Sequence, residues 1–285
     1  MQKIWVCGAR GQIGQAVNDV VDKLEFEMLD TDVDDLDVTD TDEVLRFGEM
    51  NRPDIIINCS GMTDISSCEE NPSQAFKVNA LGARNLAIVA AKMQAKMVQL
   101  STDDVFDGKS TEPYTEFDIT NPGTVYGKSK LAGENYVKEF TTKHFIVRST
   151  WVYGKGQNFI NGFLKKVDAG EQLSIASDQF GSPTSANELA RFLLHLVHTS
   201  EYGTYHATNK GVCSRYVFAQ EILKMTGKTA SMQPVPTVMS DFSKVRPAYA
   251  VLDNSIMSMV PIYDFPDWQD SLREYLEERG LYHAE

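Results

Sequence analysis

The chain has 285 residues, 42% of them hydrophobic and 24% charged, which is the composition of an ordinary soluble globular protein with a sizeable core. Lys and Arg total 27 against 40 Asp and Glu, and the resulting net charge of -13 argues against nucleic acid or an anionic membrane as a partner. An anionic nucleotide ligand would need local positive potential from helix N-termini and a few placed Lys or Arg side chains.

No apolar stretch reaches the length of about 18 residues that a transmembrane helix needs. The first residues run directly into a strand-like segment without a signal-peptide pattern, so we expect a cytoplasmic protein. The four cysteines show no CxxC pairing and no metal-ligand spacing. Cys7 and Cys59 are expected to be buried free thiols at the ends of apolar strands.

Strands and helices are predicted to alternate over the first half of the chain. In chain order they are a strand at 3–7, a glycine-rich turn, a helix at 15–23, a strand at 26–30, a helix at 41–49 capped by Thr39 or Thr41, a strand at 54–59, a helix at 72–93, a strand at 97–101, a helix at 128–140 and a strand at 144–148. This order is typical of a Rossmann-type α/β fold with a doubly wound parallel sheet. Right-handed crossovers place the ligand crevice at the C-terminal edge of such a sheet.

The regular alternation ends near residue 150, where Pro, Gly and aromatic residues become more frequent. We therefore expect a Rossmann domain over residues 1–150 and mainly a smaller, substrate-binding lobe over residues 151–285, with some later segments returning to the first domain. No repeat or low-complexity linker separates the two parts, so they are expected to pack closely.

The glycine-rich turn, residues 8–14 (GARGQIG), follows the first strand and opens the first helix. Glycines there allow a tight turn and let the backbone approach a pyrophosphate at the helix N-terminus. The GxxGxxG spacing favours short-chain reductases over other Rossmann enzymes. A tight turn without a ligand is the alternative, and the strand–turn–helix setting argues against it. Residues 1–150 are therefore predicted to bind NAD(P).

The choice between NADH and NADPH stays open. Asp30 ends the second strand, where a carboxylate can bond the adenosine ribose and disfavours the additional phosphate of NADPH. Arg10, inside the turn, can instead receive that phosphate.

Tyr126 and Lys130 form a YxxxK pattern at the start of a predicted helix, where residues four apart share one face. Reduction of a ketone leaves an alkoxide that must be protonated, and a tyrosine with a pKa near about 10 does this poorly at neutral pH. A fixed lysine nearby stabilises the phenolate and lowers that pKa. Ser101 and Thr102 end a strand at the same edge, where their hydroxyls can bond the substrate carbonyl and the tyrosine. The pattern alone also arises by chance, as a surface Tyr and Lys.

Together these residues resemble the dTDP-4-dehydrorhamnose reductases, a family of extended short-chain dehydrogenase/reductases, over nearly the whole chain. The stretches that carry the resemblance are 8–14, 53–58, 78–86, 100–108, 125–134, 148–154, 178–184 and 246–253.

The resemblance implies a role for each of five residues around the sugar. Tyr126 would donate the proton to the C4 oxygen, and Lys130 would tune it and bind the cofactor. Thr102 would tune the tyrosine and, with Asp103, contact the sugar, while Trp151 would pack on the sugar ring. Residues expected to bind the cofactor, besides Tyr126 and Lys130, are Gly8, Arg10, Gly11, Gln12, Ile13, Gly14, Asp30, Asp37, Val38, Gly61, Met62, Thr63 and Leu100.

Two departures from the family pattern affect the expected sugar pocket. Asp104 stands where the family usually has tyrosine, which removes an aromatic wall and adds a charge. Gly61 and Met62 replace a small residue followed by an aromatic one.

Three further features have ordinary structural explanations. His195 and His198 lie one turn apart on a predicted helix at 187–198, but no third metal ligand is placed, so they are expected on a half-exposed face. The acidic run at 30–42 is interpreted as a strand end and a solvated loop. The aromatic cluster at 263–268 is expected to pack the last helix. Some members of the resembled family form homodimers around magnesium, but no residue here can be assigned to the ion.

The expected function is reduction of the C4 ketone of dTDP-4-dehydro-6-deoxy-L-mannose to dTDP-L-rhamnose by hydride transfer from NADPH or NADH. The alternatives are a reductase of another nucleotide-linked 4-keto-6-deoxysugar, a non-catalytic NADP-binding regulatory subunit, and a short-chain reductase of a non-sugar substrate. The presence of Thr102, Tyr126 and Lys130 argues against the regulatory subunit. Trp151 and the 178–184 stretch argue against a non-sugar substrate.

Overall fold

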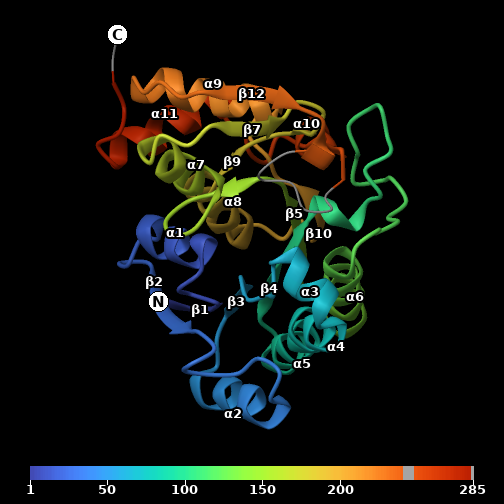
Figure 1. Cartoon of the computed structure of the whole chain (residues 1–285). Helices are drawn as coiled ribbons and strands as arrows, with labels where there is room; N and C mark the ends of the chain where they lie inside the picture. The colour runs from blue at the N-terminus through green and yellow to red at the C-terminus, as the bar shows by residue number, and fades with distance from the viewer. Residues whose placement is uncertain (240–246, 284–285) are drawn as a thin grey trace.

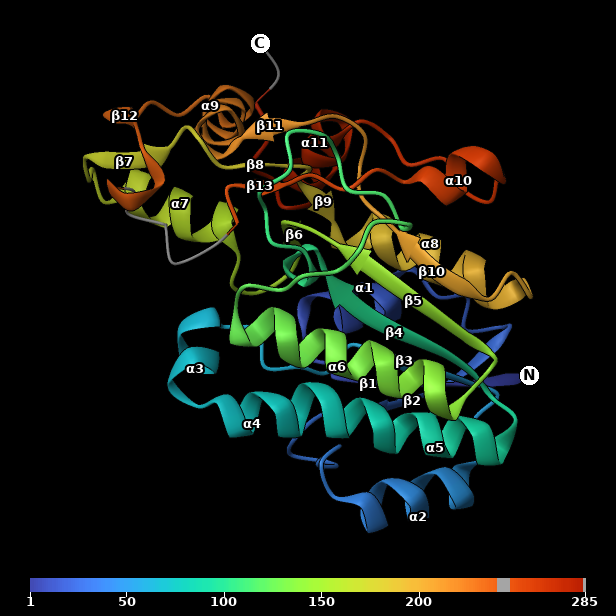
Figure 2. The same cartoon turned by 90° about the vertical axis from the view of Figure 1, so that its right-hand side faces the viewer.

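The computed structural model describes residues 1–239 and 247–283. A six-stranded parallel sheet lies between two layers of helices, and a smaller lobe stands over its C-terminal edge (Figures 1 and 2). The strand order is β2–β1–β3–β4–β5–β10, so the chain reverses direction across the sheet between β1 and β3. In open α/β sheets this switch point is where ligands bind.

The five predicted strands are confirmed to within about two residues at each end. The sheet consists of β1 Gln2–Cys7, β2 Phe26–Thr31, β3 Ile55–Asn58, β4 Lys96–Thr102, β5 His144–Ser149 and β10 Gly203–His206. The last strand was not predicted; it pairs in parallel with β5 and returns the chain to the sheet from the second half of the sequence.

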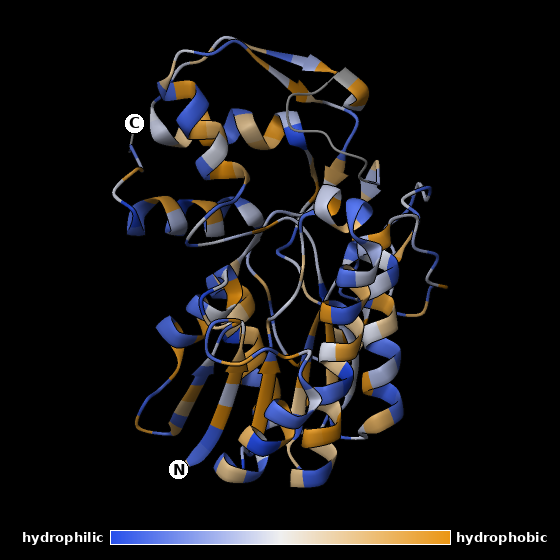
Figure 3. Cartoon of the chain, turned by 60° about the horizontal axis from the view of Figure 1, so that its bottom comes forward, coloured by the Kyte–Doolittle hydropathy of each residue, from blue (hydrophilic) through white to orange (hydrophobic). Residues whose placement is uncertain are grey.

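Alternate residues of the strands fill two separate cores, as the two-residue period of a strand requires. Ile4 and Val6 of β1 face the core under helices α1 and α8, whereas Trp5 and Cys7 face the core under α2 and α5. Several strands of the sheet are accordingly coloured as hydrophobic (Figure 3).

The helices that cover the sheet are α1 Gln12–Val20 and α8 Ala186–His198 on one face, and α2 Thr41–Asn51, α5 Ala83–Met93 and α6 Val125–Phe140 on the other. Several predicted boundaries and one predicted cap were wrong. Helix α1 begins three residues earlier than expected, because Gly11 serves as its N-cap, and it ends at Val20 instead of residue 23. Helix α6 also begins three residues earlier than expected, at Val125. Helix α2 is capped by Asp40, whose carboxylate accepts a 3.0 Å hydrogen bond from the Glu43 amide, and not by a threonine.

The predicted helix at 72–93 is one continuous helical run with a change of pitch. It divides into α4 Pro72–Phe76, a π-helix η1 Lys77–Gly82, and α5. The π-helical turn carries the buried Asn79 toward the site. Such turns are often found at functional sites.

The lobe has its own hydrophobic core among α7, β7, α9 and α11. Its longer elements are α7 Phe159–Asp168, β7 Leu173–Ala176, α9 Arg215–Thr226, β12 Met232–Val235 and α11 Trp268–Glu278. Shorter elements of the whole chain, of which α3 and η2 belong to the Rossmann part, are α3 Ile65–Glu70, η2 Asp103–Val105, β6 Val152–Tyr153, β8 Phe180–Gly181, β9 Thr184–Ser185, β11 Cys213–Ser214, η3 Thr237–Met239, β13 Tyr249–Ala250 and α10 Ser255–Met259.

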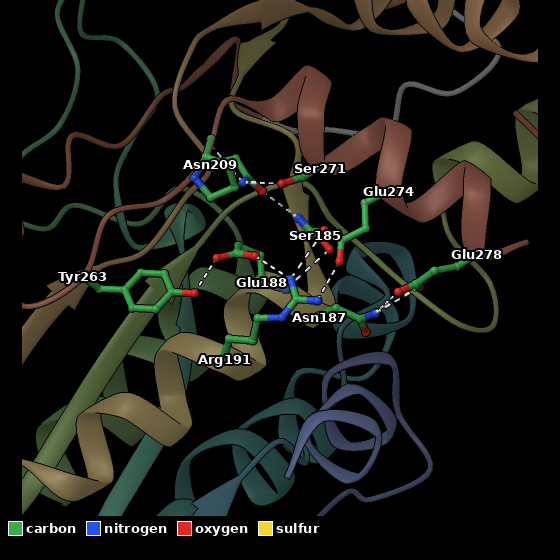
Figure 4. Close-up of polar contacts among 10 residues, drawn as sticks. Ser185, Asn187, Glu188, Arg191, Asn209, Tyr263, Ser271, Glu274 and Glu278 are labelled. Carbon is green, nitrogen blue, oxygen red and sulfur yellow. Dashed lines mark hydrogen bonds and ion pairs between the residues drawn. The ribbon is translucent and has the colours of Figure 1, made fainter. Parts of the chain in front are cut away.

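Polar contacts between α8 and α11 fix the lobe to the Rossmann part (Figure 4). The guanidinium of Arg191 donates to Glu188 at 2.7 Å on its own helix and to Glu274 of α11 at 2.6 Å. Asn209 donates to Ser271 at 2.8 Å, and both residues are buried. One ion pair and one buried hydrogen bond therefore join the lobe to the Rossmann part.

The features set aside in the sequence take ordinary places. Within residues 1–239 and 247–283 no group of His, Cys, Asp and Glu could hold a metal, and no helix is long and apolar enough to cross a membrane. The cysteines are free thiols; Cys7 is buried and Cys59 half-buried. The aromatic cluster is split: the Tyr263 ring packs on Phe192 of α8, and Trp268, which begins α11, packs on Phe218 of α9.

Candidate active site

A cleft of about 660 Å³ lies between the C-terminal edge of the sheet and the lobe. Its wall combines the glycine-rich turn, the ends of β3 and β4, the first turns of α6, and residues of the lobe. The predicted site residues that line it are Gly11, Gln12, Ile13, Gly61, Thr63, Leu100, Thr102, Asp103, Tyr126, Lys130 and Trp151. The sheet edge therefore brings together residues up to 140 positions apart in the sequence, from Gly11 to Trp151.

The glycine-rich turn has no room for side chains at two of its glycines. Gly8 has a φ of +76°, and a Cβ there would lie 2.7 Å from the Ser60 amide nitrogen. A Cβ on Gly14 would lie 2.6 Å from the Cα of Ala9. Gly11 is the N-cap of α1, and no side chain of the described residues caps that helix, so the amides of its first turn, at Gln12 and Ile13 in the cleft wall, can donate to a ligand. An uncapped N-terminus in this position fits the pyrophosphate of a dinucleotide.

The residues predicted near the adenosine lie beside the cleft, outside its wall. Asp30 is exposed near the end of β2, and Asp37 accepts a 2.8 Å hydrogen bond from the Thr39 amide. Val38 is buried below Gly82. Met62 also does not line the cleft.

Arg10 is held by the acidic loop that follows β2. Its guanidinium donates to Asp34 at 2.7 Å and to Asp35 at 2.9 Å, while its amide donates to Asp32 at 2.9 Å. Three aspartates of the acidic run at 30–42 thus belong to an exposed loop that surrounds the Arg10 side chain. They also engage the side chain that was expected to receive the additional phosphate of NADPH.

Tyr126 and Lys130 lie in the first two turns of α6, which begins at Val125 with Thr124 as its cap. The Thr124 hydroxyl accepts a 2.9 Å hydrogen bond from the Gly127 amide. Both Tyr126 and Lys130 are buried, and both line the cleft. Burial lowers the pKa of the Lys130 ammonium to about 8, against the opposing effects of Glu134 and Cys59.

Asn79 joins the loop after β3 to the turn that carries Tyr126. Its side-chain oxygen accepts from the Met62 amide at 2.8 Å, and its nitrogen donates to the Met62 carbonyl at 2.9 Å. The same nitrogen donates to Ser129, whose hydroxyl donates to the Tyr126 carbonyl at 2.8 Å. The π-helical turn thus positions the two sides of the cleft relative to each other.

The end of β4 turns its two hydroxyls in different directions. Thr102 lines the cleft, donates to Asp103 at 3.0 Å and accepts from the Asp104 amide at 3.2 Å. Ser101 also lines the cleft, but its hydroxyl, which was expected to bond the substrate carbonyl or the tyrosine, donates to Glu134 at 2.6 Å. Asp104, where the family usually has tyrosine, is buried and does not belong to the cleft wall.

A buried ion pair lies directly below this edge. Arg148 of β5 donates to both carboxylate oxygens of Glu134, at 2.9 and 2.7 Å. His206 lies 3.5 Å from Arg148, and burial together with that charge lowers its pKa to about 3. The histidine is therefore neutral, and the pair holds α6, β4 and β5 together through Glu134.

Trp151 follows β5 with a φ of +47°, a left-handed conformation that is unusual for a bulky residue. Its indole packs on Gly181, where a Cβ would lie 2.6 Å from Cε2. Its ring is also covered by the guanidinium of Arg215, whose central carbon lies 3.4 Å from the ring centroid. The lobe therefore builds a dedicated place for this ring.

Several residues of the cleft wall were not predicted. Ser149, Val152, Tyr153 and Gln179 lie in stretches that carried the resemblance, but no role was given to them. Those without any signal are Ser60, Asp64, Gln157, Asn158, Phe159, Arg215 and Phe218. Arg246, at the edge of the last resemblance stretch, lies outside the described residues.

Comparison with known proteins agrees with this geometry. A family model described as the RmlD substrate binding domain matches residues 1–280. The chain belongs to this family. The resemblance to dTDP-4-dehydrorhamnose reductases found in the motifs is thereby confirmed, and the RmlD match extends over both the Rossmann part and the lobe.

Known relatives and solved structures resemble this RmlD-family chain over nearly its full length. The spore coat polysaccharide biosynthesis protein SpsK of Bacillus subtilis is 35% identical, covering 98% of this chain and 99% of that protein. A dTDP-4-dehydrorhamnose reductase structure from Clostridium acetobutylicum has 40% identity and a TM-score of 0.95, covering 98% of this chain and 100% of that one. The Bacillus anthracis dTDP-4-dehydrorhamnose reductase, solved with NADP, has 35% identity and a TM-score of 0.93, covering 98% and 99%.

A more distant likeness shows the fold alone. The UDP-glucose 4-epimerase of Thermus thermophilus is 18% identical with a TM-score of 0.83. The Rossmann-type fold predicted from the order of elements, and the extended short-chain dehydrogenase/reductase form of it implied by the resemblance, are confirmed for this RmlD-family chain.

Proposed function

We propose that this chain reduces the C4 ketone of dTDP-4-dehydro-6-deoxy-L-mannose to dTDP-L-rhamnose with NADPH or NADH. The observation that carries the proposal is one cleft in which Tyr126, Lys130, Thr102 and Trp151 meet beside the uncapped N-terminus of α1. Relatives named dTDP-4-dehydrorhamnose reductase, such as that of Aggregatibacter actinomycetemcomitans at 32% identity, support the choice of substrate.

The glycine-rich turn would hold the cofactor pyrophosphate at the amides of Gln12 and Ile13, because no side chain caps this helix. Lys130 would hold the nicotinamide ribose, and Asp30 the adenosine ribose. When bound, the cofactor supplies the hydride that reduces C4. Gly61, Thr63 and Leu100 would line the rest of its cleft.

Tyr126 donates the proton that the C4 oxygen needs after reduction. The ammonium of Lys130, one helical turn away and buried in the same cleft, stabilises the resulting phenolate. Thr102 donates a hydrogen bond to the same oxygen once substrate displaces its contact with Asp103. Trp151 packs against the deoxysugar ring.

NADH and NADPH are both candidates for the cofactor. The B. anthracis relative was solved with NADP. In this chain Asp30 favours NADH, and Arg10 would have to exchange Asp34 and Asp35 for the additional phosphate. A homodimer, and a magnesium ion at its interface, stay predictions of the resemblance.

The test follows loss of reduced-nicotinamide absorbance with the 4-keto substrate, run separately with NADPH and NADH. We expect rapid oxidation by the natural chain and, for Tyr126→Phe, loss of at least about 100-fold in turnover with cofactor affinity retained, the range seen for general acids. Turnover by Tyr126→Phe equal to that of the natural chain would exclude the proton-donor role. Cofactor binding without any turnover by the natural chain would favour a regulatory subunit or another nucleotide sugar.

A further inference from the structure

The acidic loop that follows β2 is fixed against the glycine-rich turn. The amides of Gly8 and Ala9 donate to the carbonyl of Thr31, the last residue of β2, at 2.9 and 3.1 Å. The next amide, that of Arg10, donates to the Asp32 carboxylate at 2.9 Å. These three hydrogen bonds give Arg10 a defined backbone position, from which its side chain reaches the loop.

Two carboxylates of this loop bind the Arg10 guanidinium. One of its terminal nitrogens donates to Asp34 at 2.7 Å, and the other donates to both oxygens of Asp35, at 2.9 and 3.1 Å. The Asp35 carboxylate is itself oriented, because it accepts a 3.1 Å hydrogen bond from the Asp32 amide. A guanidinium is a planar fork of donors that suits a phosphate as well as a carboxylate. In this chain the carboxylates already occupy that fork.

Negative charge exceeds positive charge around this arginine. The end of β2 and the first residues of the loop bring four carboxylates to one guanidinium, those of Asp30, Asp32, Asp34 and Asp35. All of these aspartates are exposed except Asp32, which is half-buried. A further anionic group placed here would therefore meet net negative charge unless it displaced the carboxylates from Arg10.

The additional phosphate of NADPH is such a group. It is attached to the 2′ oxygen of the adenosine ribose, where NADH has a hydroxyl, and it carries about −1.5 to −2 charges near neutral pH. In a Rossmann fold the pyrophosphate lies at the N-terminus of the first helix and the adenosine ribose at the end of the second strand. In this chain these places are the first turn of α1 and Asp30, and Arg10 and its loop adjoin both.

We infer that Asp34 and Asp35 make this chain select NADH over NADPH, because they engage the cation that a 2′ phosphate would need. The inference deepens the proposed function and rests on it only in that a nicotinamide cofactor binds at the glycine-rich turn. NADH has no 2′ phosphate and loses nothing to the Arg10 contacts, whereas NADPH must break them and leave two carboxylates beside its phosphate. The loop is exposed, so screening limits the effect, and we expect a preference of about 10-fold.

The test measures the calorimetric Kd of NADH and of NADPH, and kcat/KM with each, for the natural chain and for a double variant with Asp34→Asn and Asp35→Asn. Asparagine keeps the size of the side chains and removes both charges, and the contacts of Asp32 with the backbone stay in place. In the double variant the affinity for NADPH should rise about 10-fold, while that for NADH changes by less than about threefold. Adenosine 2′,5′-bisphosphate and adenosine 5′-monophosphate, which differ only in that phosphate, should show the same pattern without any turnover.

A third substitution ties the gain to the arginine. Arg10→Met, added to the double variant, should remove most of the gain in NADPH affinity, because the released guanidinium is the group that binds the phosphate. In the natural chain, where the loop engages the arginine, Arg10→Met should weaken NADPH binding by a factor at least about fivefold smaller. The four proteins together form a double-mutant cycle.

The matched control removes two charges elsewhere. Asp168 and Asp270 are exposed aspartates of the lobe, paired with Lys228 and Arg273, and neither lines the cleft. Asp168→Asn together with Asp270→Asn should leave the ratio of the two cofactor affinities unchanged. That result would exclude a general effect of net charge, which salt screens over this distance.

The outcomes separate this inference from the proposed function. A natural chain that binds NADPH as tightly as NADH would overturn the inference, whether or not it reduces the 4-keto sugar. A preference for NADH that is the same in the double variant would assign selectivity to Asp30 and also overturn it, as would a gain that Arg10→Met does not reduce. Selective binding of NADH that the double variant relaxes, without turnover of the 4-keto sugar, would support the inference while removing the proposed reaction. A natural chain that binds neither cofactor would remove both.

Discussion

Replacing Lys130 by methionine should stabilise the protein while it removes function. The ammonium is buried, and its pKa falls from 10.5 to about 8 on folding because burial disfavours the charged form. At 1.36 kcal/mol for each pKa unit, the difference of about 2.5 corresponds to about 3 kcal/mol of folding free energy lost near pH 7. Methionine fills a similar volume without the charge, so Lys130→Met should regain most of this lost folding free energy.

The pH dependence gives this prediction its sign. Below pH 8 the lysine is protonated in both the folded and the unfolded chain, so the full cost of the buried charge is present. Between pH 8 and 10.5 the folded protein releases the proton while the unfolded chain keeps it, and stability of the natural protein rises relative to the variant. The advantage of Lys130→Met should fall from about 3 kcal/mol at pH 7 to about 1 kcal/mol at pH 9.5.

The assay is urea unfolding of both proteins without cofactor at several pH values in this range. Lys128→Met is the control, because Lys128 is exposed on the same helix, and it should change stability by less than about 0.5 kcal/mol at every pH. Addition of NADPH or NADH should raise the melting temperature of the natural protein much more than that of Lys130→Met. A variant that is less stable at pH 7, or whose advantage does not shrink with pH, would refute the buried-charge argument.

Two further substitutions, the first with a matched control, test the contacts of Trp151 and of Arg148. Gly181→Ala should displace the Trp151 ring, because its Cβ would lie 2.6 Å from Cε2, and the expected cost is about 1–3 kcal/mol with a raised KM for the substrate. Gly162→Ala, where nothing lies within 4 Å of the added Cβ, should be neutral or slightly stabilising, and an equal loss in both would contradict the packing argument. Glu134→Gln should lower the free energy of unfolding by about 3–5 kcal/mol, because it leaves Arg148 buried without its carboxylate. Urea denaturation measures this loss, and a loss below about 1 kcal/mol would mean that water or a neighbour replaces Glu134.

The Rossmann half could be predicted from the sequence because its signals are local. Each of the first five strands is a short apolar run followed by a turn or helix, and the sheet confirms all five. The candidate catalytic groups follow the same logic, since Tyr126 and Lys130 are four residues apart on one helix and Thr102 ends a strand. Periodicity and spacing over a few residues are sufficient to place such groups at the crevice edge.

Elements defined by distant contacts were harder to predict. Strand β10 has only four residues and is recognisable by its pairing with β5, to which no local pattern points. The π-helical turn keeps the hydrophobic pattern of an α-helix, so its pitch and the position of Asn79 depend on contacts with Met62 and Ser129. The cap of α2 was assigned to Thr39 or Thr41, but Asp40 between them is an equally good capping residue, and only the backbone decides among the three.

On the lobe side of the cleft only Trp151 was predicted, from the family resemblance. Gly181 of β8 lies in a stretch that carried the resemblance but was given no role, and Arg215, which begins α9, had no signal in its own segment. The role of these residues depends on contacts among them. Gly181 leaves room for the Trp151 indole, and the indole stacks against the Arg215 guanidinium. A UDP-glucose 4-epimerase at 18% identity shares this fold, so the fold alone does not choose the substrate. Selectivity for a nucleotide sugar must therefore be sought in contacts between distant segments of this kind.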